Sequence, residues 1–160
     1  MIYSQLFLGH AKLRIMDDAI AGYKQELRAA ALRVTSGRVA VLGALEQAPH
    51  STAEQVFEQI SGTLPGTSPQ AVYMVLNDLT RTGLIRRFEP AGSAALYERR
   101  IGDNHHHLVC ESCGTVQDVD CAAGKAPCLH PRGAKGFRVR EAEVTYWGLC
   151  PRCAAAPATD

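Results

Sequence analysis

Hydrophobic residues recur at helical spacing through the first part of the chain. Ile20, Tyr23 and Leu27 lie on one face of a helix, followed by alanines at 30 and 31, which predicts an amphipathic helix from about residue 17. The same pattern predicts a second helix from Thr35, its expected N-cap, to about Gln47. This part of the chain is therefore predicted to be helical.

Capping signals predict two further helices. One is expected to begin at Ser51 or Thr52, because Ser51 and Glu54 have the spacing of a capping box. The other is expected to run from Ser68, an N-cap followed by proline at the first helical position, to a stop at Gly83.

The pattern then changes to short extended runs at 84–88 and 94–97, on either side of a turn at 89–93 that contains proline and glycine. Helices that end in a helix-turn-helix and lead into a β-hairpin predict a winged helix. The exposed face of the helix at 68–82 would enter the major groove of DNA, and the hairpin would lie along the backbone.

The composition changes this picture little. Hydrophobic residues make up 46% and charged residues 21% of the chain, and the net charge is +1. The longest apolar run, Val39 to Leu45, is too short to span a bilayer, and the N-terminus lacks an export signal, so we expect a cytoplasmic protein.

Between Asp17 and Glu98, seven basic residues stand against nine acidic ones. Charge alone therefore favours DNA binding no more than an ordinary solvated surface.

Six cysteines are the first strong chemical signal. Four of them form two Cys-x-x-Cys pairs: Cys110 with Cys113, and Cys150 with Cys153. Two such pairs far apart in a sequence are typical of a structural zinc site with four thiolates. The alternatives are two redox-active pairs or unrelated buried thiols. Cys121 and Cys128 fit no such pattern and are free thiols, a disulfide that forms on oxidation, or packing residues.

Three consecutive histidines precede the first cysteine pair. On a strand, His105 and His107 share one face and His106 lies on the other. A second expected strand at 116–120 carries Asp118. Mixed imidazole and carboxylate ligands suit iron, manganese or zinc. The alternatives are a surface histidine cluster or a vector-derived tag, but three histidines at an internal position are too few for a tag.

These motifs, in this order, resemble the ferric uptake regulator family. The resemblance rests on the histidines and cysteines at 105–114, on Asp118, and on Tyr-Trp-Gly-Leu-Cys-Pro-Arg-Cys at 146–153. Upstream it continues with Leu-Arg-Val-Thr at 32–35, Pro-His-Ser-Thr-Ala-Glu at 49–54 and Ala-Val-Tyr at 71–73, so it covers about residues 17–153. The segments Asp-Asn-His-His-His and Trp-Gly-Leu-Cys are most similar to an actinobacterial branch that is often linked to catalase genes.

The resemblance implies an α+β, homodimeric, metal-activated repressor that binds double-stranded operator DNA. An N-terminal extension (1–16) would precede a winged-helix DNA-binding domain (17–98), a small α/β metal-binding dimerisation domain (99–153) and a tail (154–160). The four paired cysteines would hold structural zinc. A regulatory site for Fe(II) or Mn(II) would use five residues: His50, Glu98, His105, His107 and Asp118.

The predicted helices and hairpin place five residues where they are expected to contact DNA: Arg38, Ser68, Gln70, Tyr73 and Arg86. Tyr73 is alternatively a core aromatic residue. The sequence departs from the family at the recognition helix, because Ala-Val-Tyr-Met at 71–74 replaces the more usual Thr-Val-Tyr-Arg. One polar contact and one arginine are absent, so we expect a different operator. Asn104 stands where some members have a ligand of a third metal site, which makes that site unexpected here.

Three functions are consistent with these residues. The first is a peroxide-responsive repressor of catalase-type genes, in which iron and peroxide oxidise a ligand histidine; Asp118 favours it, because iron-sensing members more often have glutamate there. The second is an iron-responsive regulator without peroxide sensing, favoured by Glu98, where the peroxide branch often has aspartate. The third is a zinc-dependent enzyme. It is disfavoured because a four-thiolate site is closed and the His-x-Glu element of zinc deaminases is absent.

Overall fold

The computed structural model of the chain describes residues 3–103, 105–120, 132–140 and 142–156. The chain forms two compact units, which divide after Ile101, close to the boundary expected between residues 98 and 99. Asn104, Cys121 and Cys128 lie outside the described residues.

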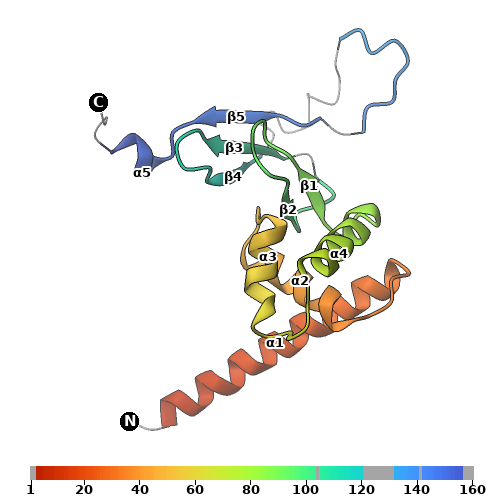
Figure 1. Ribbon diagram of the computed structural model, residues 1–160, viewed down its shortest axis with the longest axis vertical. Coiled ribbons are helices and arrows are strands. Elements are labelled where there is room, and N and C mark those ends of the chain that lie inside the picture. The colour runs from red at the N-terminus through yellow and green to blue at the C-terminus, as the bar shows by residue number, and fades with distance from the viewer. Residues whose placement is uncertain (1–2, 104, 121–131, 141, 157–160) are drawn as a thin grey trace. The chain divides into compact units, whose positions relative to one another are not determined.

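The first unit contains four helices followed by a two-stranded sheet (Figure 1). Its elements are α1 (Tyr3–Ala29), α2 (Ser36–Gln47), α3 (Ala53–Ser61), α4 (Pro69–Arg81), β1 (Arg86–Phe88) and β2 (Leu96–Glu98). This is the order of elements predicted for a winged helix. Helix α1 begins at Tyr3, so it continues through the residues predicted as an N-terminal extension. All four helices contribute to one hydrophobic core, which includes Leu27, Leu42, Val56 and Leu76.

Local capping explains where α2 and α4 begin and where α4 ends. The Thr35 side chain accepts a hydrogen bond from the backbone of Arg38, and the Ser68 side chain accepts one from the backbone of Ala71. Gly83 follows α4 with φ +71°, in the left-handed region where glycine carries no Cβ penalty. Both predicted N-caps and the predicted stop are confirmed.

The capping box of α3 differs from the predicted one by one residue. Its partners are Thr52 and Gln55, whose side chains each accept a hydrogen bond from the other residue's backbone. The predicted pair, Ser51 and Glu54, is wrong because the backbone of Ser51 is already used in an antiparallel bridge with Tyr97 on β2. This bridge fixes the connection between α2 and α3 against the hairpin.

The second unit is a three-stranded sheet followed by a short helix. Its elements are β3 (His106–Cys110), β4 (Val116–Val119), β5 (Thr145–Gly148) and α5 (Pro151–Ala154). Strand β3 lies in the centre, antiparallel to β4 and parallel to β5. The register opposes His107 to Asp118 across β3 and β4. Helices in one unit and a small sheet in the other give the predicted α+β organisation. Among the described helices, none is long and apolar enough to cross a bilayer.

Candidate metal centres and the exposed face of α4

The four paired cysteines converge in the second unit. Cys110 ends β3, Cys113 lies in the turn after it, and Cys150 and Cys153 flank the start of α5. Their Sγ atoms all lie within 4.8 Å of one another, and those of Cys113 and Cys150 are 3.8 Å apart. Zn–S bonds of about 2.3 Å in a tetrahedron would set the sulfur atoms roughly 3.8 Å apart. The four predicted ligands therefore lie together at a spacing that suits zinc.

Hydrogen bonds already favour thiolate in part of this cluster. The Thr115 hydroxyl and backbone lower the pKa of Cys113 to about 5. The backbone N–H of Cys150 donates to Cys110 Sγ at 3.3 Å and lowers the pKa of that thiol. The pKa of Cys153 is raised to about 11, because its interactions with the neighbouring thiols outweigh a hydrogen bond from Ser112 that lowers it. A bound cation would replace the remaining protons, since thiolate is the ligand form.

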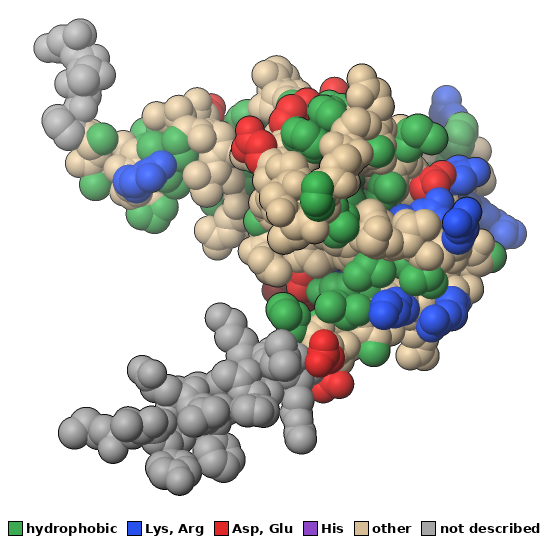
Figure 2. Space-filling model, turned by 60° about the horizontal axis from the view of Figure 1, so that its bottom comes forward, with side chains coloured by type: hydrophobic (Ala, Val, Ile, Leu, Met, Phe, Trp, Pro, Cys, Tyr) green, Lys and Arg blue, Asp and Glu red, His purple; other side chains and the backbone are tan. Residues whose placement is uncertain are grey.

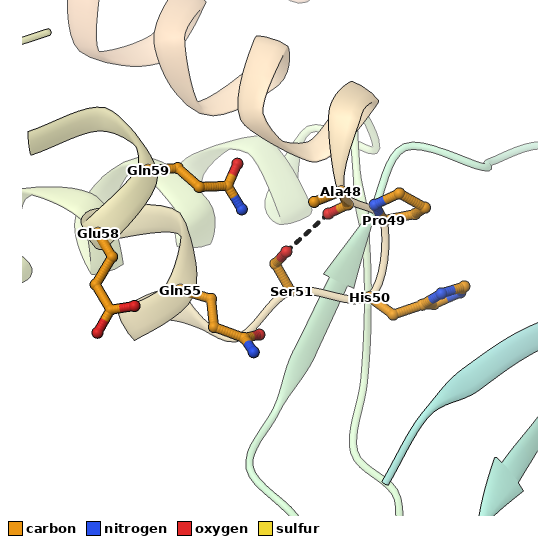
Figure 3. Close-up of a pocket in the computed structure, with 7 residues that line it drawn as sticks. All are labelled: Ala48, Pro49, His50, Ser51, Gln55, Glu58 and Gln59. Carbon is orange, nitrogen blue, oxygen red and sulfur yellow. Dashed lines mark hydrogen bonds between the residues drawn. The ribbon is translucent and has the colours of Figure 1, made fainter. Parts of the chain in front are cut away.

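In the first unit, His50 lies in the turn between α2 and α3. Its backbone φ of +60° is in the left-handed region, which residues other than glycine adopt seldom. The turn is held on both sides, because the Ser51 hydroxyl donates to the Ala48 carbonyl at 2.7 Å (Figure 3) and Ser51 pairs with Tyr97. Figure 3 shows the His50 ring pointing away from the polar side chains of α3 that line the same pocket.

The ring of His50 is directed at the end of β2. Its Nε2 atom lies 3.1 Å from Oε2 of Glu98, a fully buried carboxylate. Arg86 Nε lies 3.9 Å from the other carboxylate oxygen, and the ring of Phe88 packs edge-on against His50 at 5.8 Å. One imidazole nitrogen and one carboxylate are thus fixed side by side, which is a donor pair that suits iron or manganese.

In the second unit, His105 and His107 share one side of the sheet with Asp118. Their Nε2 atoms lie 3.9 and 3.7 Å from Asp118 Oδ1, and their ring centroids are 5.0 Å apart. His106 faces the other side, where its ring lies 6.3 Å from that of Tyr146. The alternation predicted for the three histidines is confirmed, although His105 itself immediately precedes β3.

The sequence reasoning missed one residue of this second group. Asp103 Oδ1 lies 2.7 Å from Nδ1 of His105, so it fixes the ring and leaves Nε2 directed at Asp118. The signal was a carboxylate two residues before the first histidine. His50 and Glu98 belong to the first unit, and His105, His107 and Asp118 belong to the second. A single site that joins the two groups stays a prediction.

The residues expected to contact DNA have different environments. Gln70 and Tyr73 are exposed on α4, and Tyr73 is 43% exposed, so its interpretation as a core residue is wrong. The Tyr73 hydroxyl donates to Glu54 Oε1 at 2.7 Å, which lowers the pKa of Glu54 and raises that of Tyr73. Ser68 is engaged in capping α4, and Arg38 donates to Asp78 Oδ2 at 2.6 Å.

Comparisons with known proteins agree with this organisation. The sequence model of the ferric uptake regulator family matches residues 29–147. The transcriptional regulator FurA of Mycobacterium tuberculosis is 54% identical over 136 residues, which are 85% of this chain and 92% of that protein. Ferric uptake regulation protein 2 of Mycolicibacterium fortuitum is 51% identical over 140 residues, 86% of this chain and 96% of that protein.

Solved structures show the same relationship. The ferric uptake regulator of Pseudomonas aeruginosa, solved with manganese, superposes with a TM-score of 0.66 at 27% identity and covers 81% of this chain and 98% of its own. The chain is thus a metal-responsive transcriptional regulator with a winged helix, and not a zinc-dependent enzyme. It belongs to the ferric uptake regulator family.

Proposed function

We propose that the protein is a metal-activated repressor that binds operator DNA as a homodimer and releases it in response to peroxide, controlling catalase-type oxidative stress genes. The observation that carries the proposal is the pair of nitrogen and oxygen donor groups. His50 and Glu98 form one group in the first unit, and His105, His107 and Asp118 form the other in the second unit.

A single ion of Fe(II) or Mn(II) bound by both groups would activate DNA binding. Each group alone offers few ligands, whereas together they suit these metals. An ion held by residues of both units restricts the units to one relative arrangement, so metal binding selects the conformation that is competent for DNA. Structural zinc on the four cysteines has a separate role, because it holds β3 and the segment around α5 together.

Dimerisation is supported by hydrophobic side chains exposed on the sheet of the second unit. Leu108 and Tyr146 are 39% and 46% exposed, and their pairing in the register of β3 and β5 sets them side by side on one face of the sheet. Such a surface is typical of a protein interface. Two copies would present two α4 helices to successive major grooves of a palindrome. Figure 2 shows Lys and Arg side chains on one face of the described residues, beside hydrophobic and some acidic side chains. Between Asp17 and Glu98, however, seven basic residues stand against nine acidic ones, so two copies would bind DNA more tightly than one weakly basic domain.

The donor set also supports the peroxide response. Ferrous iron, when bound, would supply the electron that reduces hydrogen peroxide next to the ligand histidines. The chain's contribution is to hold imidazole rings at that position: Asp103 orients His105, and the backbone turn orients His50. Oxidation of one of these rings would weaken metal binding and hence DNA binding.

Peptide mass spectrometry tests this proposal. Zinc-loaded protein is supplied with Fe(II) or Mn(II), exposed briefly to a low peroxide concentration, and assayed in parallel for release of operator DNA. We expect His50 or a histidine at 105–107 to gain one oxygen atom, with loss of DNA binding, only in the iron form. Disulfide formation at equal rates with either metal, or zinc loss before histidine oxidation, would contradict the proposal.

The alternative is an iron-responsive regulator that does not sense peroxide. It is favoured by two relatives from Mycolicibacterium fortuitum, which are named ferric uptake regulation proteins and are 51% and 52% identical to this chain. The peroxide operon regulator of Bacillus subtilis is only 25% identical to it. The same experiment separates the two functions. DNA binding that requires Fe(II) but survives peroxide without histidine oxidation would establish the alternative.

A further inference from the structure

Met74 is an unusual residue on the exposed face of α4. Its side chain is 70% exposed, the highest value among the large hydrophobic residues described in the first unit. The buried side of the same helix is formed by Val72, Leu76 and Leu79, so Met74 points away from the core. A long apolar side chain at this position adds little to the packing of its own domain, so it is available to contact a partner.

The neighbours of Met74 on this face carry amide side chains. Helical spacing places Gln70 one turn before it and Asn77 close behind it, and both are exposed. Arg81 lies further along the same face and is bonded to Asp78 at 2.8 Å. Met74 is therefore an apolar position between amide groups, near the middle of the helix that the proposed function places in the major groove.

This combination of groups matches the chemistry of an A·T base pair. In the major groove, thymine presents a methyl group that makes apolar contacts, and adenine presents a donor and an acceptor that match the amide of glutamine or asparagine. A G·C pair has no methyl group at that position. The flexible, polarizable side chain of methionine adapts easily to a small apolar group.

We infer that Met74 is a specificity-determining residue that contacts a thymine methyl group in each half of the operator. The inference rests on the proposed function, because it requires α4 to enter the major groove. It also accounts for the absence of the arginine that many family members have at this position: this chain replaces a charged contact with an apolar one, and so prefers thymine there.

The test uses the manganese-loaded, zinc-containing protein and a labelled duplex that the wild type recovers from a random-sequence pool. Each thymine in turn is replaced by deoxyuridine, which removes only the methyl group, and affinity is measured by fluorescence anisotropy. Loss of one buried methyl contact should weaken wild-type binding roughly four-fold per half-site, the equivalent of about 0.8 kcal/mol. Met74→Ala should bind the thymine duplex at least that much more weakly and should be insensitive to deoxyuridine at that one position.

Met16→Ala is the matched control, because Met16 is also an exposed methionine of the first unit, at 55%, but lies on α1. It should keep both wild-type affinity and wild-type sensitivity to deoxyuridine. Met74→Leu, which retains an apolar side chain, should keep the sensitivity, and Met74→Ala should keep wild-type sensitivity at the other thymines, which excludes misfolding as the cause.

Other outcomes overturn the inference. Equal affinity of Met74→Ala and wild type, or unchanged deoxyuridine sensitivity at every position, would show that Met74 does not read thymine. Impaired dimerisation of Met74→Ala with normal DNA contacts would assign the residue to a protein interface instead. Failure of the wild type to select any duplex with metal bound would overturn the proposed function itself, and this inference with it.

Discussion

Loss of Cys153, a predicted zinc ligand, should unfold the second unit and spare the first. Among the described residues of the second unit, the buried hydrophobic side chains are Val109 and Cys110. Burial of a side chain such as Val109 contributes about 1.5–3 kcal/mol, and Cys110 is itself one of the predicted zinc ligands. Metal binding at a four-thiolate zinc site contributes about 10–16 kcal/mol. Zinc bound by the four cysteines would therefore stabilise this sheet more than hydrophobic burial does, and Cys153→Ser would remove that stabilisation.

The first unit has no such dependence, because its hydrophobic core is formed by residues between Tyr23 and Tyr97. We therefore expect the amides of β3, β4 and β5 to lose protection in Cys153→Ser, while those of α2, α3 and α4 keep it. Hydrogen exchange followed by mass spectrometry measures both units in one experiment, and zinc content is measured on the same sample. Cys128→Ser, a cysteine outside the predicted ligand set, is the matched control and should behave as wild type.

Two results would refute this reasoning. If Cys153→Ser retained one zinc per chain and full protection of β3, the cysteine cluster would not be the structural site. If the helices of the first unit lost protection together with the sheet, the two units would not be independently stable.

Three smaller changes probe the first unit. Leu76→Ala, at a fully buried position on α4, should lower the free energy of unfolding by about 2–5 kcal/mol in a urea titration, and a loss below about 1 kcal/mol would contradict the packing. Arg38 lowers the pKa of Asp78 by a hydrogen bond, so the stability that this bond contributes is present above the unfolded pKa of Asp78 and is lost as the pH falls through its folded pKa. The free energies of unfolding of wild type and Arg38→Met should therefore converge at low pH. A difference that stays constant with pH would argue against this contribution. Tyr73→Phe removes the hydrogen bond that lowers the pKa of Glu54, so an NMR titration should show that pKa rise, and an unchanged value would exclude the contact.

Local signals predicted most of the elements. Side-chain capping by Thr35 and Ser68 depends on residues within three positions along the chain, so the sequence contains all the information. The cysteine pairs were likewise recognisable, because the spacing within each pair is set by the geometry of a turn around one ion.

Long-range contacts account for what the sequence did not show. The capping box of α3 uses Thr52 and Gln55, and not the predicted Ser51 and Glu54, because Ser51 pairs with Tyr97, far along the chain. Arg38 was expected to contact DNA, yet its guanidinium is bonded to Asp78, 40 residues away. Such pairings depend on the packed arrangement of elements, which hydrophobic periodicity does not specify.

The central claim is that metal bound by the nitrogen and oxygen donors switches DNA binding. The most direct measurement is the anisotropy of a labelled operator duplex during a Mn(II) titration of the zinc-loaded protein. Wild type should bind only as manganese is added, and His107→Ala should need far more metal or fail to bind. His106→Ala, which alters the histidine on the other side of the sheet, should follow wild type. DNA binding by wild type in the presence of a manganese chelator, or an identical titration for His107→Ala, would contradict the account.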